Sequence, residues 1–403
     1  MLTILLILLF IFIFFNGVFT RIFLEIGLLE LKSFVPEIII LLVVLIIIIK
    51  DIFIRKKISN IFNLSLIFSM LILIKLLLDM AEGITLIQIV YIFRDLMLPF
   101  LLFYLYINSH LFYINSKIII EKMVKVSKCF LILGLILGIL QVVLGWEFTS
   151  KLYTGYAFFG DDIETGIRIY TNNGGLLRIP SLTGSFTLFG IMNLFAIFFI
   201  YLTKTKHKER YFVAALINCI LTTSRTSMLM IIIFFVLNIP LKKIVKFLRI
   251  IIIIVPPIII LLATKMKSIF SIESLLIRIE EVWPMLLSQF KNISNLIFGG
   301  NLYDYGTVSA LAESQIDLFG YNRWVDNTYL YLFLTLGILG VTLYLMLVGD
   351  CYMKSVKETR ALIISISVGA IFASFFTGRV MIVFYLCIAL SYHYSLNISE
   401  EVI

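Results

Sequence analysis

Long runs of leucine, isoleucine and phenylalanine alternate along this chain with short segments that carry the charged residues. A helix needs about 20 apolar residues to cross a bilayer, and fewer where other helices surround it. The pattern therefore predicts twelve membrane-spanning helices, two of them short, at residues 2–20, 34–50, 60–80, 84–108, 124–145, 180–203, 211–223, 225–240, 247–264, 326–348, 361–377 and 379–396. We expect an all-α polytopic membrane protein in which residues 1–403 form a single membrane domain.

The composition agrees with this interpretation. Hydrophobic residues make up 61% of the 403 residues and charged residues 14%, whereas soluble domains are roughly 45–50% apolar and about 25% charged. The first segment, Leu2 to Phe15, lacks a basic region and a small-residue cleavage site, so we expect a retained anchor rather than a signal peptide. The cysteines lie within or beside apolar runs without CxxC spacing. We therefore expect small buried side chains, and neither a disulfide framework nor a zinc site, at Cys129, Cys219, Cys351 and Cys387.

The polar sequence Thr-Thr-Ser-Arg at 222–225 decides the orientation of every later span. It divides residues 211–240 into two short spans, and the main alternative is one continuous helix, which would invert everything downstream. With twelve spans and the N-terminus inside, 19 of the 33 lysines and arginines fall in inner loops. A single helix would instead place the basic cluster at 242–249 outside, against the positive-inside rule. The split is therefore preferred, with both termini cytoplasmic, and the basic charge of these loops does not indicate a nucleic-acid partner.

Two large outer loops follow from this orientation, at residues 146–179 and 265–325. The first carries Asp161, Asp162 and Glu164, which suit a solvated loop face better than a site for a divalent ion. In the second, residues 274–290 have apolar side chains at helical spacing, which indicates an amphipathic helix lying on the outer membrane surface. Pro284 is expected to kink or restart that helix.

Arginines gather at the outer ends of the predicted helices. A helix N-terminus favours an anion because its first backbone N–H groups are unpaired, so an arginine there is unfavourable unless something negative binds. Before the sixth span, Arg178 precedes Pro180, and we expect that proline to open the helix. Four helix starts carry an arginine within a few residues, and a fifth arginine lies on the amphipathic segment: Arg178, Arg225, Arg323, Arg379 and Arg278. Each alone could reach lipid phosphates at the interface, but the set suits a pyrophosphate, which guanidinium groups bind in a bidentate way.

Three further sites carry charge or a titratable ring. Asp326 opens the tenth span, where it can cap the helix, act as a carboxylate that orients or deprotonates a hydroxyl group, or do both. The positive helix end and nearby arginines favour its charged form and weaken it as a base.

Arg94 and Asp95 lie inside the fourth span, where pairing with another helix is expected ahead of a direct catalytic role. The three histidines all map to the inner side, so no histidine base or histidine metal site is expected outside: His110, His207 and His393.

Four sequence stretches together resemble the superfamily of O-antigen polymerases and O-antigen ligases, bacterial enzymes of surface-polysaccharide synthesis. The stretches are Leu-Arg-Ile-Pro-Ser-Leu-Thr-Gly at 177–184, Leu-Thr-Thr-Ser-Arg-Thr-Ser at 221–227, Arg278 to Trp283 followed by Phe-Gly-Gly at 298–300, and Asp-Asn-Thr-Tyr at 326–329 with Gly-Ile-Leu-Gly at 337–340. Each motif alone is weak, whereas the ordered set with the large loop before the fourth motif is similar to the family over roughly residues 145–345.

The resemblance implies a glycosyltransferase that needs no metal or other cofactor, with a GT-C-like helical membrane architecture. Its expected partners are the lipid bilayer, undecaprenyl-diphosphate-linked glycans at the outer leaflet of the bacterial cytoplasmic membrane, and a chain-length regulator protein. Matched by motif, Arg178, Arg225 and Arg278 are expected to hold the diphosphate. Further substrate contacts are expected from Arg323, Arg379 and Trp283.

One departure from the family pattern separates its two activities. Ligases of this superfamily resemble the fourth motif with a histidine where this chain has Asp326. The absence of that histidine favours a polymerase, which joins lipid-linked oligosaccharide repeat units into O-antigen or capsule. The alternatives are a ligase that transfers the finished glycan to lipid A-core, and a flippase for the lipid-linked sugar. A flippase is less favoured because only Arg94 and Asp95 are deep polar residues and no inverted repeat is visible.

Overall fold

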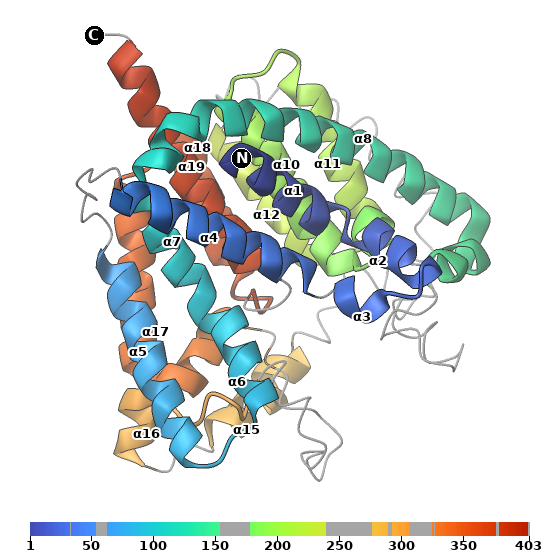
Figure 1. The fold of residues 1–403 in the computed structure, drawn as a ribbon. Helices are drawn as coiled ribbons and strands as arrows, with labels where there is room; N and C mark the ends of the chain where they lie inside the picture. Colours follow the sequence, from blue (N-terminus) through green and yellow to red (C-terminus); the bar gives the residue numbers. More distant parts are fainter. Residues whose placement is uncertain are drawn as a thin grey trace. The chain divides into compact units, whose positions relative to one another are not determined.

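The structure, a computed structural model, describes residues 1–32, 34–53, 63–153, 178–238, 276–288, 292–305, 325, 327–375 and 379–401. Within these residues every regular element is a helix and no strand occurs (Figure 1). By length and composition, five of the described helices can cross a membrane. The number is six if α1 (Leu2–Phe14) and α2 (Asn16–Glu25), bent by 86°, form one span. The all-helical fold is confirmed, while the count of twelve spans and the GT-C-like architecture stay predictions.

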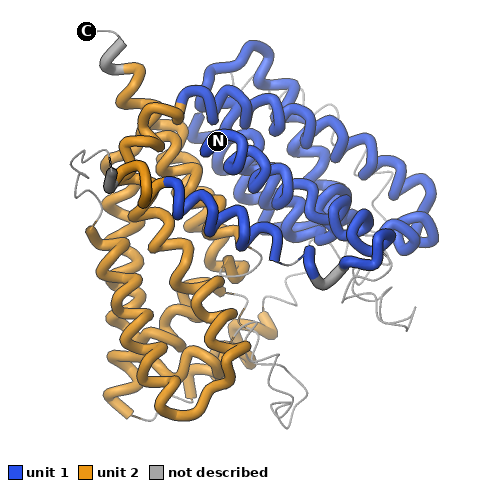
Figure 2. The backbone as a smooth tube through the Cα atoms, in the orientation of Figure 1, with its two compact units in different colours: residues 1–46, 117–272 blue, residues 47–116, 273–403 orange. Residues whose placement is uncertain are grey.

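The chain groups into two compact units, each built from two stretches that are distant in sequence (Figure 2). The first unit contains residues 1–46 and 117–272, and the second contains residues 47–116 and 273–403. Two of the three boundaries fall inside helices, α4 (Val35–Phe53) and α8 (His110–Tyr153). Each unit has its own aromatic core.

The first unit is organised around α10 (Phe186–Leu202), whose side chains are buried without interruption from Phe189 to Leu202. Such a helix is apolar on all sides because neighbours cover all of its faces. Phe10 of α1 lies 5.5 Å from Phe199 between ring centroids, and Phe130 of α8 lies 5.6 Å from Phe189. Because α10 is buried on every face, its phenylalanine side chains fill the core of this unit.

Two short helices complete this unit, α11 (Lys208–Leu221) and α12 (Arg225–Asn238). The chain between them leaves the helical conformation, and Thr223 adopts the left-handed region with φ 51°. Residues 208–238 therefore form two helices, and the break lies at the polar sequence 222–225 as predicted. The predicted span at 247–264 lies outside the described residues.

The second unit contains α5 (Asn63–Ala81) and a continuous helical segment made of α6 (Leu86–Ile92), a π-helix at Phe93–Met97 and α7 (Leu98–Asn108). It also contains α17 (Thr328–Met353), α18 (Lys357–Gly369) and α19 (Val380–Glu401). Phe100 of α7 lies in its core, in contact with Phe68, Tyr344 and Tyr385 at 4.4, 6.4 and 5.1 Å between ring centroids. α19 runs parallel to α7, because the His393 ring is hydrogen bonded to the Tyr106 carbonyl while Tyr385 packs on Phe100.

The helix α17 is broken at Gly337, where the backbone has φ 66° and ψ −167°. The ring centroids of Tyr329 and Tyr344 are 6.1 Å apart, whereas 15 residues of continuous helix span about 22 Å. The chain therefore turns back at Gly337, and the two parts of α17 lie beside each other. The expected single straight helix is therefore two helical parts joined by a sharp break at Gly337. By length and composition, Thr328–Met353 still counts among the five candidate spans.

Other boundaries also move. The predicted span at 124–145 is part of the 44-residue helix α8, which is broken at Gly145 (φ 73°) and so takes in the start of the first outer loop. The predicted span at 361–377 is the shorter α18, which ends at Gly369. Three cysteines are buried as expected, and the prediction is wrong for Cys129, which is exposed on α8.

Candidate functional site

The first motif forms a tight buried turn in the first unit. Ser181 has the left-handed φ of 42°, and its N–H donates to Gln141 Oε1 at 3.1 Å while its hydroxyl donates to the Gly134 carbonyl at 2.9 Å. A non-glycine residue in this conformation persists only where its surroundings hold it. Gly184 then adopts φ 73°, and Ser185 caps α10 by accepting a hydrogen bond from the Leu188 N–H.

This turn corrects the expected start of the sixth span. Pro180 precedes a short 3₁₀ turn, Ser181–Thr183, and the long helix begins only at Phe186. Arg178 nevertheless lies close to that helix start, because its guanidinium carbon is 4.9 Å from the centroid of the Phe186 ring. A cation over an aromatic face is favourable, so the turn brings the arginine back to the first residue of α10.

The second motif is joined directly to the first. The Ile179 N–H donates to the Leu221 carbonyl at 3.2 Å, which links the segment after Arg178 to the end of α11. Arg225 is the first residue of α12 and is exposed. The serine before it helps to cap that helix, since Ser224 Oγ accepts from the Ser227 N–H at 3.4 Å. A Cβ on Gly190 would overlap the Ser227 side chain, so only glycine allows α10 and α12 to approach this closely.

A buried pair of asparagine side chains joins the helices that carry these two motifs. Asn218 Nδ2 donates to Asn193 Oδ1 at 2.9 Å and to the Leu131 carbonyl at 3.2 Å, so it ties α11 to α10 and α8. Both asparagines are fully buried, where amide groups are costly unless hydrogen bonded. Sequence analysis did not single them out, because isolated asparagines in apolar runs give no pattern.

The third and fourth motifs meet in the second unit. The Gly300 N–H donates to the Leu334 carbonyl at 2.8 Å. Gly299 (φ 79°) and Gly337 (φ 66°) pack backbone against backbone, and a Cβ on either would overlap the main chain of the other segment. The Phe-Gly-Gly turn that ends α16 (Ile293–Phe298) is therefore fitted to the break in α17.

A buried carboxylate continues this contact. Asp79 at the end of α5 accepts a hydrogen bond from the Leu302 N–H at 2.7 Å, which secures the chain just after the Phe-Gly-Gly turn. Burial, together with the nearby Asp304 and Glu82 carboxylates, raises the pKa of the Tyr303 hydroxyl beside it. Asp79 is 1% exposed, and its role was not foreseen.

Arg278 and Trp283 lie on the predicted amphipathic segment. Its described part is a helical stretch, with a π-helix at Arg278–Val282 followed by α15 (Trp283–Leu287). Leu286 is buried, whereas Ile279 is 45% exposed. The described residues are helical, while an amphipathic helix over 274–290 that lies on the outer membrane surface stays a prediction.

The start of α17 differs from expectation by one residue. Asn327, rather than Asp326, is the N-cap, and its side chain accepts from the Leu330 N–H at 3.0 Å. Arg323 and Asp326 lie outside the described residues, so their predicted roles stay predictions. The next residue, Thr328, joins the start of α17 to the segment between α18 and α19. Its N–H donates to the Ala370 carbonyl at 2.8 Å, and its hydroxyl donates to the Ala373 carbonyl at 2.7 Å.

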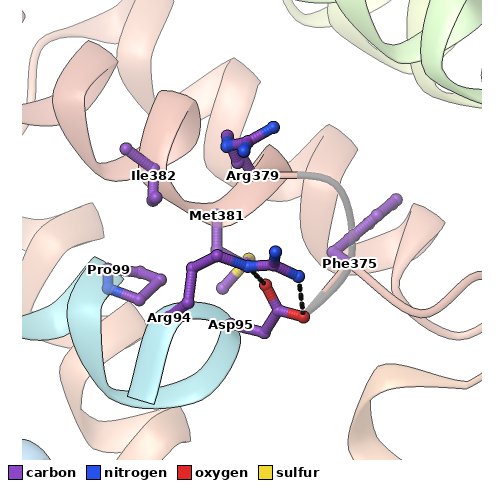
Figure 3. A pocket seen from close by; sticks show the side chains of 7 residues that line it. All are labelled: Arg94, Asp95, Pro99, Phe375, Arg379, Met381 and Ile382. Carbon is purple, nitrogen blue, oxygen red and sulfur yellow. Dashed lines mark hydrogen bonds and ion pairs between the residues drawn. The ribbon is translucent and has the colours of Figure 1, made fainter. Parts of the chain in front are cut away.

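That segment leads to a charged pocket which sequence analysis did not assemble. Arg94 and Asp95 pair with each other: Arg94 Nε lies 2.7 Å from Asp95 Oδ1, and an Nη lies 2.9 Å from Oδ2. Their expected pairing with another helix stays a prediction. Arg379, the residue before α19, lines the same pocket (Figure 3). The pocket is completed by Pro99, Phe375, Met381 and Ile382.

Comparison with known proteins identifies no relative. No family model matches the chain, and neither a curated protein nor a solved structure is significantly similar to it. Support for a function therefore comes from the residues themselves and from their geometry.

The candidate residues fall into two local groups. The first unit holds the segments of Arg178 and Arg225, which are hydrogen bonded to each other. The second unit holds Arg379 with Arg94, and it holds Arg278 on a helix of its own. Within the described residues no group of three histidine, cysteine, aspartate or glutamate side chains could hold a metal ion.

Proposed function

We propose that this protein is a membrane glycosyltransferase that polymerises lipid-diphosphate-linked oligosaccharide repeat units at the outer leaflet of the bacterial cytoplasmic membrane. One observation carries the proposal: the four motifs that resemble the polymerase and ligase superfamily pack together in pairs. The first and second share the Ile179–Leu221 hydrogen bond, and the third and fourth share the fit of Gly299 against Gly337. Motifs that are separate in sequence but adjacent in a fold are more informative than isolated matches.

The chemistry suits fixed cations. The oxygen of an acceptor sugar hydroxyl bonds to the anomeric carbon of the donor, while the bond between that carbon and the diphosphate oxygen breaks. The hydroxyl proton is lost to water or to the departing diphosphate, and negative charge grows on the leaving group. Guanidinium groups keep their charge at all relevant pH values and bind phosphate oxygens in pairs. Arg178 and Arg225 would stabilise that developing charge electrostatically.

Positioning of the two substrates and of Arg178 would contribute the remaining rate enhancement. Donor and acceptor both carry lipid anchors, so the membrane confines them to two dimensions and lowers the entropic cost of bringing them together. The left-handed turn at Ser181 and the cap at Ser185 place Arg178 on a rigid support at the start of α10. A group that must meet a diphosphate in one geometry benefits from such pre-organisation.

The test is the surface polysaccharide of a deletion strain complemented with variants. Arg178→Ala and Arg225→Ala should abolish long-chain polymer, while Arg210→Ala, on the predicted inner side, should leave the ladder intact. A loss of one contact to a developing charge costs roughly 100- to 1,000-fold in rate, which removes the long chains from a gel. Membrane content of each variant is measured alongside, so that a folding failure is recognised.

The phenotype of the deletion strain separates the alternatives. Lipopolysaccharide that bears a single repeat unit supports the polymerase. Core without any sugar attached would indicate a ligase, and repeat units retained on the inner leaflet would indicate a flippase. A normal ladder in both arginine variants would contradict the proposal.

A further inference from the structure

Three unusual features of the second unit meet at the charged pocket shown in Figure 3. The first is the π-helix at Phe93–Met97, which interrupts an otherwise regular α6–α7 helix. Residues i and i+1 of an α-helix do not face each other, yet Arg94 and Asp95 form a two-point ion pair here. π-Turns within helices occur frequently at functional sites.

The second feature is the cost of this pair. Its helix, residues 86–108, is one of those able to cross a membrane, and Asp95 is only 8% exposed. Charges taken out of water are expensive even when paired, and ionisable residues inside membrane helices usually serve a function. The Arg94 guanidinium also lies over the Tyr91 ring, 4.3 Å from its centroid, so it is held from two sides.

The third feature is Arg379. It has φ 66°, a left-handed conformation that costs energy for any residue other than glycine. It precedes the 22-residue helix α19 and accepts the first helical hydrogen bond, from the Val383 N–H at 3.2 Å. Strain here places a second guanidinium at the pocket that contains Arg94. The lining therefore carries two guanidinium groups and one carboxylate, Asp95. Its formal charge is positive, and in apolar surroundings an excess of positive charge favours an anion.

We propose that this pocket receives a phosphate group of the lipid-linked substrate, with Arg379 and Arg94 as its ligands and Asp95 as the residue that positions Arg94. This inference rests on the proposed function and adds to it a phosphate contact in the second unit. The seven lining side chains fill the pocket in the present structure. Binding therefore requires the apolar Phe375 side chain to move aside while Arg379 stays at the pocket.

Position favours a substrate over a bulk lipid headgroup. Arg94 lies eight residues after Leu86, where α6 begins, and this corresponds to about 12 Å along a helix. The hydrocarbon core of a bilayer is about 30 Å thick. In the predicted topology, with α6 beginning at the outer membrane surface, a phosphate at this depth has left the headgroup layer. A substrate drawn into a protein reaches this depth, and a surrounding lipid does not.

The experiment measures binding of undecaprenyl phosphate to the purified full chain in lipid nanodiscs, with phosphatidylglycerol as the competing source of phosphate. Arg94→Gln and Arg379→Gln should each raise the Kd for undecaprenyl phosphate roughly 10- to 100-fold, the value of one charge-assisted contact. Arg360→Gln is the matched control. That arginine also lies over a tyrosine ring, 5.5 Å from the centroid of Tyr352, but at the other end of α18, and its variant should bind as the wild type does.

The role of Asp95 needs a readout that a purely structural pair would not move. Exchanging the two residues, Arg94→Asp with Asp95→Arg, keeps an ion pair and should keep the thermal stability. It places the guanidinium at the other position, so affinity should still fall as in Arg94→Gln. Restored stability together with restored affinity would overturn the positioning role.

The outcomes separate this inference from the proposed function. Wild-type affinity in both Arg94→Gln and Arg379→Gln overturns the pocket assignment, even where the deletion strain behaves as a polymerase mutant. An equal loss of phosphatidylglycerol binding makes bulk lipid the ligand and also overturns it. Selective loss of undecaprenyl phosphate supports it, whatever reaction the protein performs.

Discussion

At the scale of single residues, the structure depends on a few positions whose backbone or packing admits one residue type. Gly337 combines a left-handed φ with direct backbone contact to Ile297 and Gly299. Ser181 bears the same strain without being glycine, and two buried hydrogen bonds hold it in place. These positions set the turns that carry the first and fourth motifs, so their conformations bear on any chemistry at the motif residues.

Gly337→Ala should destabilise the protein by about 2 kcal/mol or more, because the new methyl group adds a clash with backbone to an unfavourable φ. Thermal unfolding in detergent measures the loss. Gly349→Ala is the control within the same helix, since a Cβ there meets nothing within 4 Å. It should be neutral or stabilise by up to about 1 kcal/mol. Equal melting temperatures for the two variants would show that the reversal at Gly337 is not as described.

Residue patterns account for these positions unequally. The break at 222–225 was predictable, because a polar Thr-Thr-Ser-Arg sequence is costly inside a span. The reversal at Gly337 was not, since a glycine in an apolar run is ordinary in membrane helices. The pairing of Arg94 with Asp95 was missed for a related reason: helical spacing places neighbours apart, and the π-turn that brings them together has no sequence signal.

At the scale of elements, short turns rather than long helices position the candidate residues. The start of α10 is fixed by the 3₁₀ turn before it, and that turn packs against α2. A Cβ on Gly17 would lie 2.5 Å from the Gly184 nitrogen and 2.9 Å from the Leu182 carbonyl oxygen. Asn16 adds a hydrogen bond from Nδ2 to the Thr183 carbonyl at 3.2 Å. The N-terminal helices are therefore part of the support for Arg178, although the family resemblance begins only near residue 145.

Gly17→Val should push α2 away from the turn and reduce long-chain polymer in the complementation assay, as Arg178→Ala does. The steric cost of such overpacking is typically 1–3 kcal/mol, about the scale of a local displacement rather than of unfolding. Val18→Leu, at a neighbouring position that is 38% exposed, is the control and should leave the ladder unchanged. A full ladder in Gly17→Val would contradict the supporting role of α2.

At the scale of the whole molecule, the all-helical class followed from the repeated apolar runs, because each is about as long as a helix needs to cross a bilayer. The number and bounds of the spans depend on where each helix ends. Within an apolar sequence, tertiary contacts decide where a helix ends. Gly337 breaks a helix that hydropathy would continue. The sequence also does not predict which motifs lie next to each other in the fold. Asp79 and Leu302, for example, are hydrogen bonded beside the third motif but are far apart in the chain.

The central claim, that this protein joins lipid-linked repeat units, is tested most directly by reconstitution. Purified protein in proteoliposomes is supplied with the lipid-linked repeat units extracted from the deletion strain, and the products are resolved by length. We expect a ladder of products with release of undecaprenyl diphosphate, formed with or without a chelator and absent with Arg178→Ala. Repeat units that stay single in the presence of folded wild-type protein would contradict it.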